Sequence, residues 1–216
     1  MTKLRPAATW PLVHAERRAL AADLATLRPE QWETPSLCPT WTVHDVLAHL
    51  VDSAQTTRLG FVRRMIAARG DFDRDNATGL AREKRADPLQ TLAAFRTAAE
   101  LTSTPPADLA TRLVEAYAHG EDIRRPLGIR GDYPVEGVVP ALEYQLRTGA
   151  SMGGSKERTQ GVRLVGTDAG QSWGTGPEIH GSVIDLLLAI TGRPVPADRF
   201  SGEGVPMLIK DAADRS

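Results

Sequence analysis

The residues 41–50, WTVHDVLAHL, open the segment that decides the fold. Thr42 is a suitable helix N-cap, and Asp45 three residues later completes a Thr-x-x-Asp variant of the capping box. Beyond this start, apolar residues recur at helical spacing, at Val43, Val46, Leu47, Leu50, Ala54, Phe61, Val62 and Met65. The pattern predicts one helix that continues to Ala68 and is ended by Gly70.

Two of the five histidines of the chain lie on this predicted helix, His44 and His49. A helix turns about 100° per residue, so the two side chains point about 140° apart and cannot face one site. Each lies at an edge of the apolar stripe, and helix geometry alone does not choose between them. A surface or core-edge histidine is the ordinary interpretation of either residue taken alone.

The rest of the chain separates into a helical first part and a mixed second part. Helices are predicted over residues 10–27, 87–102 and about 106–125, while the polar segment 72–87 is predicted to be a long connection. After about residue 128 we expect a helix at 135–152, short strands near 161–168 and 172–176, a helix at 181–193 and a strand at 205–210. The predicted fold class is therefore mainly α. A four-helix bundle over residues 1–130 precedes a small mixed α/β unit over residues 131–216.

The composition is that of an ordinary globular protein. The 216 residues are 41% hydrophobic and 25% charged, with a net charge of −1. There is no basic excess for nucleic acid, no apolar run of membrane-spanning length and no signal-peptide core in the sequence. The single cysteine excludes an internal disulfide and a cysteine-rich zinc site. We expect a cytoplasmic protein with neither a nucleic-acid nor a membrane partner; the oligomeric state is left open.

A second motif, Glu115-Ala-Tyr-Ala-His119, has the spacing of a helical metal-binding pair. An i, i+4 spacing puts both side chains on one helix face, one turn apart, where they can grip one metal ion. A solvent-exposed helix pair has the same spacing, so the motif is weak by itself. A third ligand from a neighbouring helix would give a two-histidine, one-carboxylate set, which zinc, iron, nickel and cobalt all accept.

Taken together, WTVHDVLAHL at 41–50 and EAYAHGEDIRRPLG at 115–128 resemble the mycothiol-dependent maleylpyruvate isomerase family of the DinB-like superfamily. The tail GTDAGQSWGTGPEIHGSVIDLLLAITGRP resembles the C-terminal part of such proteins. The resemblance implies a four-helix bundle that holds a divalent metal, zinc in the first place, with nickel, cobalt or iron as alternatives. Its ligands would be His49, Glu115 and His119, and His44 would have no metal role.

The resemblance also implies thiol chemistry. The open metal position would take a low-molecular-weight thiol, mycothiol, as a cosubstrate, and the metal would deprotonate it to a nucleophilic thiolate. That thiolate would isomerise a small electrophilic substrate or be transferred to it. Two alternatives remain at this point: a hydrolase that uses metal-bound water on the same ligands, and a binding protein whose metal is structural. The substrate and the thiol-binding residues are not indicated by the sequence.

Several other residues carry weaker expectations. Asp122 can hold the second ring nitrogen of a ligand histidine and so orient it. Cys38, near a helix N-terminus, is expected to be a partly buried loop residue, because the thiol of the reaction comes from outside. His14 and His180 are expected in surface or loop positions.

Overall fold

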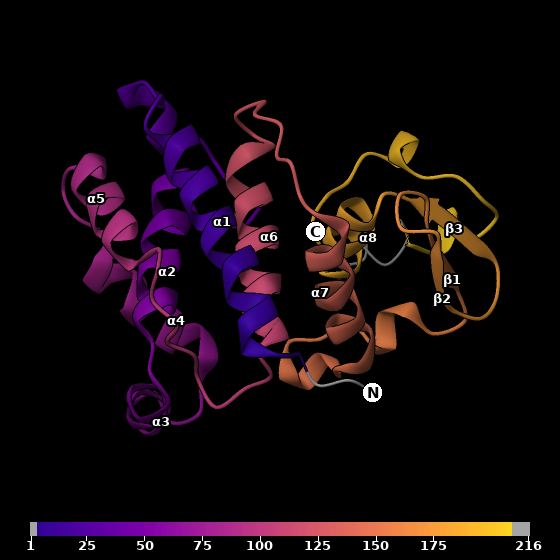
Figure 1. Cartoon of the computed structure of the whole chain (residues 1–216), viewed down its shortest axis with the longest axis horizontal. Coiled ribbons are helices and arrows are strands. Elements are labelled where there is room, and N and C mark those ends of the chain that lie inside the picture. The colour runs from indigo at the N-terminus through magenta and orange to yellow at the C-terminus, as the bar shows by residue number, and fades with distance from the viewer. Residues whose placement is uncertain (1–3, 209–216) are drawn as a thin grey trace. The chain divides into compact units, whose positions relative to one another are not determined.

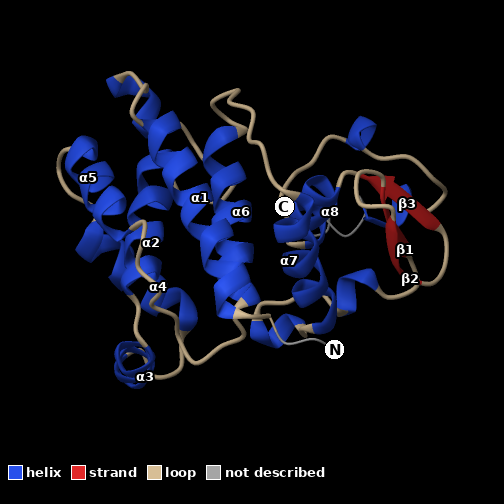
Figure 2. Cartoon of the chain, in the orientation of Figure 1, coloured by secondary structure: helices blue, strands red, loops and turns tan. Residues whose placement is uncertain are grey.

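The computed structural model describes residues 4–208, apart from the side chain of residue 73. The chain divides into two compact units, residues 1–132 and residues 133–216 (Figure 1). Helices build the first unit, and the strands lie in the second (Figure 2). The fold class predicted from the sequence, mainly α with a small C-terminal α/β unit, is confirmed.

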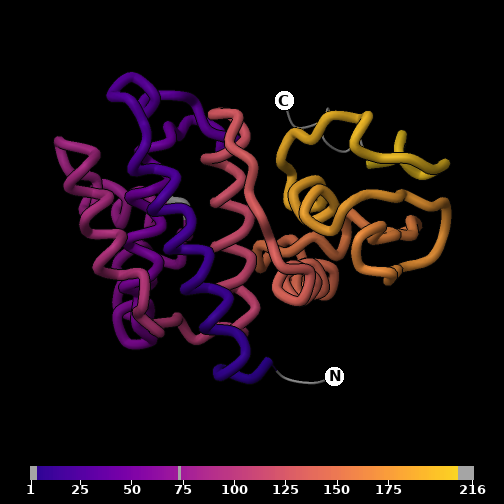
Figure 3. The backbone as a smooth tube through the Cα atoms, turned by 45° about the horizontal axis from the view of Figure 1, so that its top comes forward, coloured from indigo at the N-terminus to yellow at the C-terminus, as the bar shows by residue number. Residues whose placement is uncertain are grey.

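The first unit is a bundle of four helices with two further helices in its crossover. The bundle helices are α1 (Pro6–Leu24), α2 (Val43–Gln55), α5 (Pro88–Ala98) and α6 (Ala110–Arg124). A short 3-10 turn, η1 (Pro29–Glu33), follows α1, and the crossover holds α3 (Arg58–Ala67) and α4 (Phe72–Glu83). Helix α2 contacts α4, α5 and α6, while α1 contacts α5 and α6. Helices α1 and α6 can be followed next to each other in Figure 3.

The helix α2 begins at the predicted capping box. The Thr42 backbone N–H donates to Asp45 Oδ2 over 2.9 Å, and the Asp45 backbone N–H donates to Thr42 Oγ1 over 3.2 Å. These two bonds satisfy N–H groups that the helix itself leaves without acceptors. The apolar stripe behind the cap enters the main core, which also takes residues from α1, η1, α5 and α6. Its buried members are Leu20, Ala21, Leu24, Trp32, Val43, Val46, Leu47, Leu50, Val51, Leu92, Phe95 and Ile123.

The prediction of a single helix from residue 43 to Ala68 is wrong in one respect, because the structure has two helices there, α2 and α3. Thr56 has an extended backbone and its hydroxyl donates to the Asp52 carbonyl over 2.8 Å. Thr57 caps α3 by accepting from the Gly60 N–H over 3.1 Å. Consecutive threonines that bond to the backbone end one helix and start the next, although the apolar spacing continues across the break.

The polar connection predicted over residues 72–87 is also wrong for most of its length, since residues 72–83 form α4. Asp71 caps this helix by accepting from the Arg74 N–H over 3.0 Å. Charge pairing rather than apolar burial holds it: Arg64 bridges Asp52 of α2 and Asp75 of α4, at 2.8 Å to each. An apolar-periodicity search has no signal for a helix that is stabilised in this way.

The second unit packs two helices with a three-stranded sheet. Helix α7 (Val135–Arg147) contacts α8 (Val183–Ile190), and α8 contacts β1. The strands are β1 (Arg163–Gly166), β2 (Gln171–Gly174) and β3 (Glu178–Gly181), in the order β2-β1-β3, and the 3-10 turns are η2 (Ala150–Met152), η3 (Glu157–Thr159) and η4 (Ala197–Arg199). β1 pairs antiparallel with β2 and parallel with β3, so Leu164 lies opposite both Trp173 and Ile179.

The predictions for this unit differ from the structure at three places. The helix predicted over 135–152 ends at Arg147, because Thr148 has an extended backbone. The segment 174–181 lacks strand alternation because of its glycines and proline, yet its last four residues form β3. The strand predicted at 205–210 is wrong where the structure describes it, because residues 205–208 are helical. Residues 209 and 210 lie outside the described residues. The predicted cap of α8 is present, with the Asp185 N–H donating to Ser182 Oγ over 3.3 Å.

Candidate metal centre

The helices α2 and α6 pack against each other in the first unit and carry all three predicted metal ligands. His49 of α2 is 7% exposed, and its ring centroid lies 4.9 Å from that of His119 and 5.2 Å from that of Trp41. Within the described part of the chain, the buried His49 Nδ1 has no hydrogen-bond partner. Burial, together with repulsion from a charged His119, lowers the pKa of His49 to about 4. His49 is therefore neutral at pH 7 and keeps a lone pair for a cation.

Glu115 of α6 is held by an arginine and a serine. Arg112, one turn earlier, donates from Nη2 to Glu115 Oε1 over 3.0 Å and from Nη1 to Ser53 Oγ over 2.8 Å. The Ser53 hydroxyl donates in turn to Glu115 Oε2. Burial alone would raise the pKa of Glu115, but the charge of Arg112, with His49 and the Ser53 bond, lowers it to about 2. The Glu115 carboxylate is thus anionic and oriented, and its oxygens have further lone pairs that can bind a cation.

His119 lies one turn beyond Glu115 and is bound on one edge of its ring. Its Nδ1 is 2.8 Å from Asp122 Oδ2 and 3.7 Å from Cys38 Sγ. Burial would lower the pKa of His119, but the bonds to Asp122 and Cys38 raise it to about 9. Because Nδ1 faces Asp122, the Nε2 atom is the nitrogen left for another contact.

The loop before α2 brings the cysteine to this cluster. Cys38 Sγ lies 3.0 Å from Asp122 Oδ2, and the Leu37 N–H donates to the Asp122 carbonyl over 3.1 Å. Asp122 is completely buried. The Cys38 N–H also donates to Ser36 Oγ over 3.1 Å, which closes a tight turn. Cys38 is a partly buried loop residue, as expected, but its contact with Asp122 and His119 is one that the sequence did not indicate.

The donor atoms that converge most closely are not the predicted set. Among residues 4–208, the one group of three whose candidate ligand atoms all lie within 4.8 Å of one another is Cys38, His119 and Asp122. His49 and Glu115 are not members of this group. The residues nevertheless fit a cation. The two imidazoles lie with their ring centroids 4.9 Å apart, the anionic Glu115 comes one turn before His119 on α6, and the buried His49 Nδ1 has no hydrogen-bond partner in the described structure.

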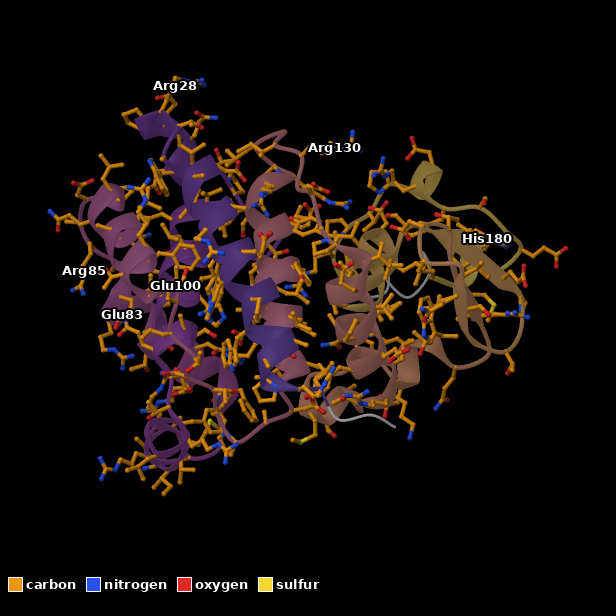
Figure 4. All side chains as sticks on the ribbon, in the orientation of Figure 1. Arg28, Glu83, Arg85, Glu100, Arg130 and His180 are labelled. Atoms are coloured by element: carbon orange, nitrogen blue, oxygen red, sulfur yellow. The ribbon has the colours of Figure 1, made fainter. Side chains whose placement is uncertain are left out.

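The other histidines lie elsewhere. His44 is buried on the opposite side of α2, where its Nε2 is 2.9 Å from Thr91 Oγ1 of α5. His14 is more enclosed than the surface position expected for it: it stacks on Trp10, and its Nδ1 pairs with Glu100 at 3.1 Å. His180 lies on β3, where it pairs with Glu178 at 2.8 Å (Figure 4).

The segment that builds this cluster matches a known family. Residues 13–119 match the family described as the mycothiol maleylpyruvate isomerase N-terminal domain. Over these residues the chain is similar to that family. The match includes Cys38, His49, Glu115 and His119, and it confirms the resemblance seen in the sequence.

Relatives and solved structures extend the comparison over most of the chain. Two uncharacterized proteins of Mycobacterium tuberculosis, from strains CDC 1551 / Oshkosh and ATCC 25618 / H37Rv, are each 27% identical over 226 residues, covering 84% of this chain and 83% of the relative. The crystal structure of the mycothiol-dependent maleylpyruvate isomerase superposes with a TM-score of 0.59 at 18% identity, over 94% of this chain and 96% of that one. A point mutant of that isomerase gives a TM-score of 0.61 at 15% identity with the same coverage. These solved structures share the fold of the chain.

Proposed function

We propose that the chain is a divalent-metal-dependent enzyme that uses a low-molecular-weight thiol of the mycothiol type to isomerise, or to add to, a small electrophilic substrate. The proposed metal ligands are His49, Glu115 and His119, in a metal-binding domain over residues 1–130. The proposed metal is zinc, with nickel, cobalt or iron as alternatives. The observation that carries the proposal is the buried, neutral His49, whose ring lies 4.9 Å from that of His119 and whose Nδ1 lacks a partner in the described structure.

The side chains around these ligands support the proposal through what they do to charge and orientation. Arg112 keeps Glu115 ionised and fixes both of its oxygens, one directly and one through Ser53. Asp122 accepts from His119 Nδ1, so Nε2 is the nitrogen that remains for a metal. A bound divalent cation would act as a Lewis acid that converts a thiol into a thiolate at neutral pH.

Two further parts of the proposal follow from the chemistry. A thiol cosubstrate requires a compartment that keeps thiols reduced, so we propose a cytoplasmic location. No helix in residues 4–208 combines the length and the apolar character that crossing a bilayer requires. The proposed partners are a small-molecule substrate and the thiol itself.

Metal analysis of the purified full chain tests the ligand set. After expression in metal-replete medium, we expect about one divalent ion per chain. Dialysis against a chelator that leaves the wild type loaded should remove the ion from the His49→Ala variant. Wild-type protein with no bound metal would contradict the proposal.

Addition of mycothiol to the cobalt-substituted Cys38→Ser variant tests the thiol step. Cys38 is the only cysteine of the chain, so a thiolate-to-cobalt absorption band in this variant must come from the added thiol. The band is the expected result. Bound cobalt with exchangeable water and no thiol band would favour a hydrolase, and cobalt without any exchangeable ligand would favour a structural metal in a binding protein.

A further inference from the structure

We infer that Cys38, His119 and Asp122 form a second metal-binding arrangement, in which the cation is held by Cys38 Sγ, His119 Nδ1 and Asp122 Oδ2. It shares His119 with the proposed ligand set but does not require that set. The three ligand atoms all lie within 4.8 Å of one another, and they come from the loop before α2 and from the end of α6.

The distances between the three atoms suit a tetrahedral cation after a small adjustment. Bonds of about 2.3 Å to sulfur and about 2.0 Å to nitrogen or oxygen place tetrahedral ligand atoms roughly 3.3–3.6 Å apart. The separation of Cys38 Sγ from His119 Nδ1 is 3.7 Å, just above this range. Asp122 Oδ2 lies 3.0 Å from Sγ and 2.8 Å from Nδ1, so these two distances would open by about 0.5 Å.

The chemistry of the three ligand atoms favours a borderline or soft divalent cation. Two donor groups, the Cys38 thiol and the His119 ring N–H, converge on the same oxygen of the buried Asp122. A cation would replace both protons, releasing them to solvent while the thiolate, the imidazole and the carboxylate become its ligands. A thiolate, an imidazole and a carboxylate together favour Zn²⁺ or Co²⁺ over Mg²⁺ or Ca²⁺, which take oxygen ligands.

A second observation points to the same place. His49 is 7% exposed, and its ring lies 4.9 Å from the ring of His119. Its Nδ1 has no hydrogen-bond partner among the described residues, which is uncommon for a buried polar atom. A buried lone pair beside His119 favours a cation at this ring over a closed network of hydrogen bonds.

The ring of His119 decides between the two arrangements. A neutral imidazole has a lone pair on one nitrogen and a proton on the other. The arrangement with His49 and Glu115 uses Nε2, and Asp122 then accepts from Nδ1–H. The arrangement with Cys38 and Asp122 uses Nδ1. One His119 ring therefore serves one cation at a time, and the tautomer selects which.

Cobalt titration of the full chain tests the inference, in thiol-free buffer with a phosphine reductant. We expect a thiolate-to-cobalt absorption band without any added thiol in the His49→Ala variant, where only the second arrangement remains. The band must be absent in Cys38→Ser and in the double variant. We also expect the cobalt affinity of His49→Ala to fall tenfold or more when Cys38→Ser is added. Serine keeps the size and hydrogen-bonding capacity of cysteine, and far-UV circular dichroism checks that each variant is folded.

The outcomes separate this inference from the proposed function. A folded His49→Ala variant that binds cobalt without a thiolate band, or binds none, overturns the inference. Cobalt binding by Cys38→Ser that is lost in the double variant supports the proposed ligand set, and it shows that this set binds cobalt without the second arrangement. A thiolate band in wild type together with no cobalt binding by Cys38→Ser supports the inference and contradicts the proposed ligand set.

Discussion

The two sides of helix α2 each bury a histidine, and the two histidines differ in what surrounds them. On the α5 side, His44 is 2% exposed and its Nε2 is bonded to Thr91 Oγ1 at 2.9 Å. On the α6 side, His49 is 7% exposed and its Nδ1 has no partner among the described residues. The two histidines are thus almost equally buried, and they differ in whether these ring nitrogens have hydrogen-bond partners. A satisfied histidine stabilises the fold, whereas an unsatisfied one points to a ligand.

The largest expected effect is on metal binding. His49→Ala should lower zinc affinity by at least about 100-fold, since changes of outer-shell partners alone cost about 10–100-fold. His44→Ala is the matched control from the other side of the same helix, and it should keep the affinity within about threefold. Isothermal titration with zinc measures both variants. Equal losses in the two would remove the distinction between the sides of α2.

The next effect is on the pH dependence of the free energy of unfolding of the metal-free protein. The pKa of His49 is about 4 in the fold, below its ordinary value of 6.5, so its stabilisation is present above pH 6.5 and is lost as the pH falls through 4. The pKa of His119 is raised to about 9, so its stabilisation is present below pH 6.5 and is lost as the pH rises through 9. Each shift corresponds to up to about 3 kcal/mol.

Urea unfolding from pH 4 to 9 measures this effect when wild type is compared with His49→Gln and with His119→Gln. The comparison is needed because Glu16 titrates in an overlapping range: burial raises its pKa to about 7, although Arg124 acts in the opposite direction. Relative to His49→Gln, wild type should lose stability only on the acid side. Relative to His119→Gln, it should lose stability only on the alkaline side. Parallel curves would contradict both shifts.

A smaller effect is expected where a carboxylate orients a ligand. Asp122→Asn should weaken zinc binding by about 10–100-fold, because the amide is a poorer acceptor for His119 Nδ1–H. Asp45→Asn is the control, since Asp45 belongs to the capping box of α2 and contacts Thr42. That change should cost about 0.5–2 kcal/mol of stability and leave zinc affinity unchanged. A zinc titration with a competing chelator gives the affinities. Unchanged zinc affinity in folded Asp122→Asn would remove the orienting role of Asp122.

The smallest effect concerns the satisfied side. Thr91→Val keeps the side-chain shape and removes the bond to His44, together with the bond that Thr91 Oγ1 accepts from the Arg85 N–H, so the free energy of unfolding should fall by about 1–2 kcal/mol. Thr97 is exposed on the same helix α5, and Thr97→Val should change the free energy of unfolding by less than about 0.5 kcal/mol. Thermal or urea unfolding compares the two. A Thr91→Val variant as stable as Thr97→Val would show that the bond of His44 does not stabilise the fold.

The predictability of each element follows the kind of force that forms it. Helix α2 was predicted from its start, because Thr42 and Asp45 act within one turn. The sequence does not predict α4, because ion pairs from Asp75 to Arg64 and from Arg82 to Asp52 hold it, and these partners lie outside the helix. Gly79 of α4 lies so close to the Asp52 carboxylate that a Cβ would overlap it. In the sequence, such a close contact is visible only as a glycine, and nothing there indicates which residue lies against it.

The same distinction applies to the candidate site. The Glu115–His119 pair was predictable because an i, i+4 spacing fixes their common helix face. The role of Asp122 beside a ligand histidine was also a sequence prediction, and its bond to His119 at 2.8 Å lies within one turn. The metal ligand set itself stays a prediction. The sequence predicts no role for Cys38, because the thiol of the reaction comes from outside. Its contact with Asp122, 84 residues away, is created only by the packing of the loop on α6.

The sequence by itself determined the fold class, the start of α2 and the pairing of Glu115 with His119, because each depends on interactions within one or two helical turns. The tertiary structure decided which face of α2 carries an unsatisfied histidine and that a loop cysteine meets His119 and Asp122. Helix periodicity places His44 and His49 at equivalent edges of one stripe. Only the neighbours that packing supplies, a threonine hydroxyl for His44 and a second imidazole for His49, make them different.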